Sequence, residues 1–177
     1  MRTALLVAAS ALAAAAASPA TAQTAPEAFG FMMTFASERL APGTKLVSAT
    51  ADQAKGTYDG KGHRQTIVAT RKTACLYELD VAQVGEPGSN HSNYTTQVSV
   101  DLTNADWMKA STKSNSLVGR YVEVPGAKLC FLNDRAHLGG YMAPAKDSCG
   151  DMRTIVPIEH VMTAYQILSQ TCKPRAF

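Results

Sequence analysis

The chain has 177 residues, with 17 lysines and arginines, 14 aspartates and glutamates, and four cysteines. This length suits one domain with a buried core of its own. The formal net charge of +3 is small and spread along the chain, which excludes the dense basic face of a nucleic-acid-binding protein.

The first 22 residues are typical of a cleaved secretory signal peptide. Arg2 supplies the positive charge, an apolar run extends from Ala4 to Ala17, and the small residues 20–22 suit a signal peptidase. The apolar run is too short to cross a bilayer as a helix. We therefore expect a periplasmic or secreted protein, with one domain over residues 23–177 and no membrane span after cleavage.

The domain is predicted to begin with a core helix. Thr24 and Glu27 have the spacing of a capping box, and Pro26 is tolerated in a first helical turn. Apolar residues then recur at helical spacing until Pro42-Gly43 ends the run. They are Phe29, Met32, Met33, Ala36 and Leu40.

The middle of the chain has strand patterns. The clearest is 94–103, where apolar and polar residues alternate as in an antiparallel strand with one wet face. Glycine-rich and polar composition predicts turns or loops at 58–64, at 85–93 and at Pro125-Gly126. The other predicted strands are 44–50, 65–70, 74–84, 119–124 and 127–132.

Two further helices are predicted. Residues 103–112 suit a short helix capped by Thr103 or Asn104, with Trp107 closing the core. A longer helix begins at Pro157 and reaches Cys172, with apolar residues on one face. The order of elements predicts an α+β fold, in which a single antiparallel β-sheet is covered by the N-terminal and C-terminal helices.

The four cysteines are predicted to form two disulfides. An even number in an exported chain is typical of disulfides. Zinc sites use close cysteine pairs, whereas the gaps here are 55, 19 and 23 residues. The cysteines are Cys75, Cys130, Cys149 and Cys172.

Segment lengths favour one of the three pairings. Residues 149–156, if extended, cover about 26 Å, and a helix from Pro157 to Cys172 returns about 24 Å. A helix packed back along its own lead-in brings Cys149 to Cys172, which leaves Cys75 to pair with Cys130. The rival pairing joins Cys130 to Cys149 and Cys75 to Cys172.

The sequence lacks motifs of catalysis, metal binding and cofactor binding. It contains no G-x-S-x-G elbow and no H-E-x-x-H pair, and paired cysteines leave no thiol nucleophile. The histidines lie far apart in sequence, so a helix-borne metal site is excluded. The close carboxylates Glu78/Asp80 and Asp147/Asp151 are interpreted as solvated surface.

The stretch from Cys130 to Cys149 contains the strongest site candidates. Asp134 and His137 have the residue types of an acid/base group with its orienting carboxylate, and Arg135 is a candidate for binding an anion. Turn chemistry explains the same residues equally well.

Two functions remain open from the sequence. The first is an exported, disulfide-stabilised binding or envelope-associated protein with no catalytic motif and an unknown ligand or protein partner. The alternative is a small secreted hydrolase whose acid/base site assembles in space around His137. The lack of motifs favours the first.

Overall fold

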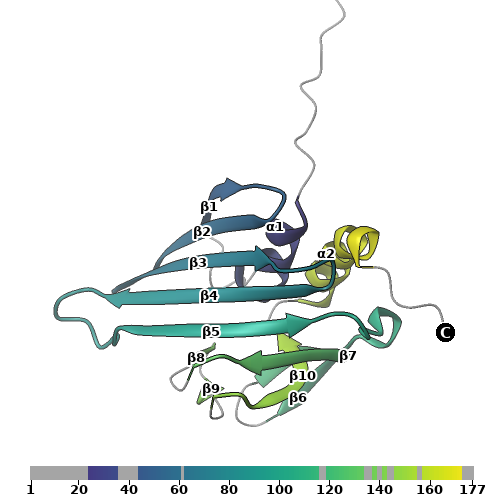
Figure 1. Cartoon of the computed structure of the whole chain (residues 1–177). Helices are drawn as coiled ribbons and strands as arrows, with labels where there is room; N and C mark the ends of the chain where they lie inside the picture. The colour runs from purple at the N-terminus through teal and green to yellow at the C-terminus, as the bar shows by residue number, and fades with distance from the viewer. Residues whose placement is uncertain are drawn as a thin grey trace, which may run out of the picture.

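An antiparallel sheet of eight strands dominates the computed structural model (Figure 1). The structure describes residues 24–35, 44–60, 62–115, 119–133, 137–138, 141–142, 146–154 and 157–172. The strand order is β1-β2-β3-β4-β5-β7-β10, and β6 pairs with β7. The strands are β1 (Thr44–Ala49), β2 (Gln53–Gly60), β3 (His63–Arg71), β4 (Leu76–Gly85), β5 (Tyr94–Asp101), β6 (Ser111–Asn115), β7 (Gly119–Phe131) and β10 (Cys149–Thr154). A separate two-stranded sheet joins β8 (His137–Leu138) to β9 (Tyr141–Met142).

The apolar side chains of the central strands form the core. Strands β1 to β5 follow one another as a meander, so residues on one face meet their neighbours directly across the ladder. Leu79 of β4, for example, lies opposite Val98 of β5, and both are fully buried. The alternation predicted for 94–103 is confirmed over β5, and the antiparallel class is confirmed with it.

The first helix begins as predicted but is shorter. The Thr24 side chain accepts a hydrogen bond from the Glu27 amide and the Glu27 side chain accepts one from Thr24, so the capping box is present at α1 (Ala25–Gly30). A π-helical turn, η1 (Phe31–Phe35), follows. Phe29 and Met32 are fully buried, as the pattern predicted, whereas Ala36, Leu40 and Pro42-Gly43 lie outside the described residues.

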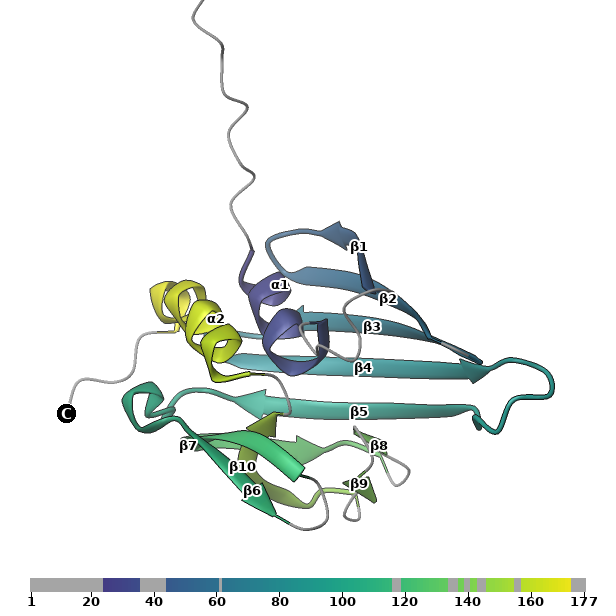
Figure 2. The same ribbon diagram turned by 180° about the vertical axis from the view of Figure 1, so that it is seen from behind.

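Helix α2 (Ile158–Thr171) follows Pro157 and buries the predicted apolar face, including Val161 and Leu168. It packs on α1 and η1, and α1 in turn packs on β2, β3 and β4. Both helices lie on the same side of the sheet (Figure 2), and β3, β4 and β5 run on past them. In the described part of the chain, no helix has the length and apolarity needed to cross a membrane.

Two turn predictions are wrong. Residues 58–60 continue β2, so the predicted turn at 58–64 shrinks to the two residues between β2 and β3. Residues 119–131 form the single strand β7, not two strands around Pro125-Gly126. The ladder with β10 shifts register here, so Pro125 and Gly126 lie in a bulge where no ladder amide is needed.

The predicted helix at 103–112 is only one 3₁₀ turn, η3 (Trp107–Lys109). Its N-cap is Asp106, not Thr103 or Asn104, because the Asp106 amide donates to Pro125 of the neighbouring strand. Trp107 does close the core: it is 4% exposed and stacks on Tyr165 of α2 at 5.2 Å between ring centroids.

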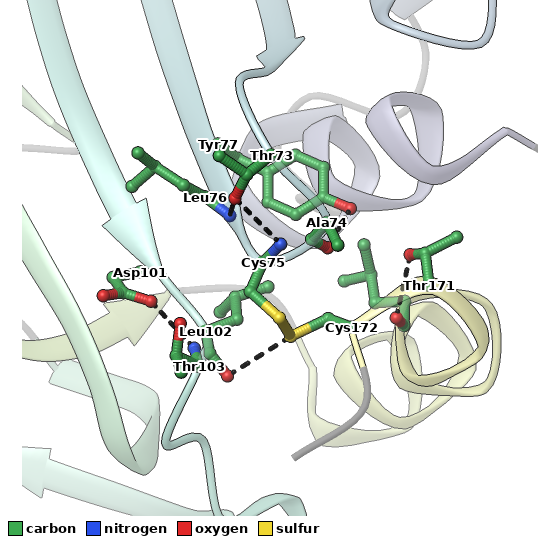
Figure 3. The surroundings of a disulfide bond; sticks show 11 residues. Thr73, Ala74, Cys75, Leu76, Tyr77, Asp101, Leu102, Thr103, Thr171 and Cys172 are labelled. Atoms are coloured by element: carbon green, nitrogen blue, oxygen red, sulfur yellow. Dashed lines mark hydrogen bonds between the residues drawn. A yellow bond between two sulfur atoms is a disulfide. The ribbon is translucent and has the colours of Figure 1, made fainter. Parts of the chain in front are cut away.

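The predicted disulfides are present, but the favoured pairing is wrong. Cys75 bonds to Cys172 and Cys130 bonds to Cys149. The favoured pairing assumed that α2 returns along its own lead-in, whereas that lead-in is β10, which pairs with β7 and places Cys149 opposite Cys130. Helix α2 instead ends over the start of β4, where Cys172 meets Cys75 (Figure 3).

Candidate functional site

The predicted acid/base group around His137 is not tested by the structure. Asp134 and Arg135 lie outside the described residues, and His137 pairs through its backbone with Met142 in the β8–β9 sheet. Nearby, the Asn133 side chain bonds to the β5 backbone at both Gln97 and Thr95. The Asn133 amide therefore extends the ladder of β5 beyond the end of β7.

The carboxylates that the sequence places close together have separate partners. Glu78 lies 3.1 Å from the Lys72 ammonium, and Asp80 accepts a hydrogen bond of 2.7 Å from Gln97. A hydrogen bond from Lys128 lowers the pKa of Asp151. Among the residues that the structure describes, no three His, Cys, Asp or Glu side chains are grouped so that they hold a metal ion.

An open hollow lies where β4 and β5 run past the helices. Its volume is about 670 Å³, which is within the range of small-molecule sites. The strands position its lining, because Gln83 and Tyr94 are opposite one another in the ladder. The lining residues are Ala82, Gln83, Val84, Ser92, Asn93, Tyr94 and Thr95.

A hydrogen-bonded network fixes the polar side of the hollow. The Gln65 side-chain amide donates to Gln83 at 2.8 Å and to the Tyr94 hydroxyl at 3.1 Å. Gln83 donates to the backbone oxygen of Ser92 at 3.0 Å. Burial raises the pKa of Tyr94, because the phenolate loses hydration there. Its hydroxyl is therefore protonated at neutral pH and serves as a hydrogen-bonding group instead of a base.

Beside this network, two histidines from different turns lie together. The rings of His63 and His91 are 4.3 Å apart between centroids and tilted by 39°. The Tyr58 ring lies on the other neighbour of the pair, 5.4 Å from His63. The Nδ1 atom of His63 is buried and has no hydrogen-bond partner among the described residues.

Sequence reasoning treated these histidines as unrelated, because 27 residues separate them in the chain. The signal that relates them is the topology. In a meander, alternate connections lie at the same end of the sheet, so the β2–β3 turn beside His63 meets the β4–β5 loop that carries His91. A count of strands before each histidine finds this contact, whereas residue spacing does not.

Comparison of the chain with protein-family models, with curated proteins and with solved structures finds no match.

Proposed function

We propose that this protein is an exported, non-catalytic binding protein that takes a small neutral molecule in the hollow between β4 and β5. The observation that supports it is the composition of the lining. Tyr94 is its only titratable side chain, and the raised pKa of Tyr94 keeps that group neutral. Such a surface can hold a ligand but offers no acid/base pair for hydrolysis.

The lining also indicates the class of ligand. Ala82 and Val84 are apolar, and Val84 is 60% exposed. Gln83 and Tyr94 add polar groups that their network holds in place. The absence of Asp, Glu, Lys, Arg and His from the lining favours an uncharged ligand that has a flat apolar face and groups able to hydrogen-bond.

Export is the second part of the proposal. The signal-like leader predicts transport to the periplasm or outside the cell, and two disulfides suit an oxidising compartment. We further propose that the terminal helices act as the cover of one sheet face, which leaves the far ends of β4 and β5 accessible to a ligand.

The test is amide chemical-shift mapping with two neutral aromatic probes, nicotinamide and phenyl β-glucoside. We expect at least one probe, at millimolar concentration, to shift the amides of residues 82–84 and 92–95. Thr95→Trp fills the hollow and should abolish these shifts. Thr112→Trp changes an exposed strand threonine on β6, outside the hollow, and should leave them unchanged.

Two results contradict the proposal. One is shifts that persist in Thr95→Trp, since the probe then binds elsewhere. The other is a measured hydrolytic activity that His137→Ala removes without unfolding the chain, which would establish the hydrolase instead.

A further inference from the structure

We propose that His63 and His91 together bind one divalent first-row transition-metal ion at the end of the sheet. The proposal uses the two imidazoles and not the hollow between β4 and β5, so it stands or falls independently of the binding function proposed above.

The separation of the two rings suits a shared ion. A metal–imidazole bond is about 2.0–2.1 Å long, so two imidazoles on one ion have ring centroids only a few ångströms apart. The centroids of His63 and His91 are 4.3 Å apart. Small rotations about the side-chain bonds are enough to direct one nitrogen of each ring to a common point.

The buried Nδ1 of His63 gives a reason for a ligand here. Buried polar atoms in folded proteins nearly always have a partner, and each exception needs an explanation. Within the described residues, Nδ1 of His63 has none. A metal ion that accepts its lone pair would supply that partner.

The backbone around the pair is tightly packed, which favours a preformed site. A side chain at Gly60 would come within 2.7 Å of the His63 ring and 2.6 Å of the Tyr58 ring. On the other side, the backbone oxygen of His91 packs against Gly85, and the Glu86 amide donates to Gly62. The two turns that carry the histidines are therefore held together by contacts other than those of the imidazoles.

The donor set indicates which ions bind. Imidazole favours Cu²⁺, Ni²⁺ and Zn²⁺, whereas Mg²⁺ and Ca²⁺ require oxygen ligands. All four cysteines are in disulfides, so no thiolate competes for the ion. With two protein ligands, water completes the coordination, and Cu²⁺ should bind more tightly than Zn²⁺.

Isothermal titration of the full chain, produced without a histidine tag, tests the site with Cu²⁺ and with Zn²⁺. We expect one saturable site per chain, and each of His63→Gln and His91→Gln should weaken it by at least about tenfold. His160→Gln is the matched control, because His160 lies on α2 against Phe31. That variant should bind within about twofold of the wild type, given the usual scatter of affinities.

Chemical-shift mapping with Zn²⁺ guards against a variant that misfolds. His91 is exposed in a loop, so His91→Gln should keep the wild-type spectrum while losing the shifts at residues 62–64 and 89–92. The proposal is overturned if no binding saturates below about 1 mM. It is also overturned if the folded His91→Gln chain binds the ions as the wild type does.

Discussion

Cys130 of β7 and Cys149 of β10 are direct partners in the antiparallel ladder, with Cα atoms 4.1 Å apart, and a disulfide joins them on an exposed part of the sheet. The other disulfide is enclosed: Cys172 is 3% exposed, and its sulfur lies 3.6 Å from the backbone oxygen of Leu102. The two bridges therefore differ in their access to solvent (Figure 3 shows the enclosed one).

This difference predicts the order of reduction. A thiol reagent must reach a sulfur atom to attack it, so low concentrations should open Cys130–Cys149 before Cys75–Cys172. Alkylation followed by peptide mass spectrometry measures the order, with circular dichroism as the check that the chain stays folded. Simultaneous reduction of both bridges in the folded protein would contradict the assignment.

Removal of each disulfide should cost a different amount of stability. Cys75 and Cys172 are 97 residues apart, and Cys130 and Cys149 are 19 apart. Chain entropy predicts losses of about 5 kcal/mol and about 3 kcal/mol respectively. We expect the Cys75→Ala/Cys172→Ala chain to unfold at lower urea than the Cys130→Ala/Cys149→Ala chain. The reverse order would show that native contacts near Cys130 outweigh loop closure.

Tyr77 predicts a loss of stability at alkaline pH. Its side chain is fully buried and stacks on Phe29 at 4.8 Å between ring centroids. Burial raises the pKa of Tyr77 in the folded chain, whereas the unfolded chain has the ordinary value of about 10. The folded state therefore holds this proton more tightly. The resulting stabilisation is complete below about pH 10 and is lost as the pH rises towards the folded pKa.

Urea unfolding at about pH 8 and about pH 11 measures this effect. We expect the free energy of unfolding to fall less over this interval in Tyr77→Phe than in the wild type. Lysines titrate in the same range, and because both proteins contain them, the comparison isolates the tyrosine. Equal losses in the two proteins would refute the expectation.

Gly126 and Gly88 separate two costs of replacing a glycine. Both have positive φ, 78° and 81°, which disfavours any other residue. A Cβ at Gly126 would also collide with the backbone oxygen of Asn104, whereas one at Gly88 would meet no atom. We expect Gly88→Ala to cost about 1–2 kcal/mol and Gly126→Ala about 1–3 kcal/mol more. Thermal unfolding measures the difference, and equal costs would mean that the bulge relaxes around the new side chain.

Much of the local structure was predictable from the sequence. The capping box at Thr24, the alternation along β5 and the apolar face of α2 were all predicted and are present. Each depends on residues within one or two turns or on one strand, so the spacing along the chain contains the information. The number of disulfides was predictable for a similar reason, since it follows from composition and leader.

The candidate site was not predictable from spacing. Asp134, Arg135 and His137 drew attention because they are adjacent in sequence, yet their proposed chemistry is still a prediction. His63 and His91 come together only because an even number of strands separates their turns. The hollow likewise depends on where the helices end relative to β4 and β5.

The sequence by itself determined the type of each main element and the presence of two bridges. The tertiary structure alone decided which cysteine meets which, that β7 continues through Pro125-Gly126, and that two distant histidines share one end of the sheet. The physical reason is that the order and register of strands follow from the packing of the whole sheet. No window of residues contains that information, because neighbours across a ladder can lie anywhere along the chain.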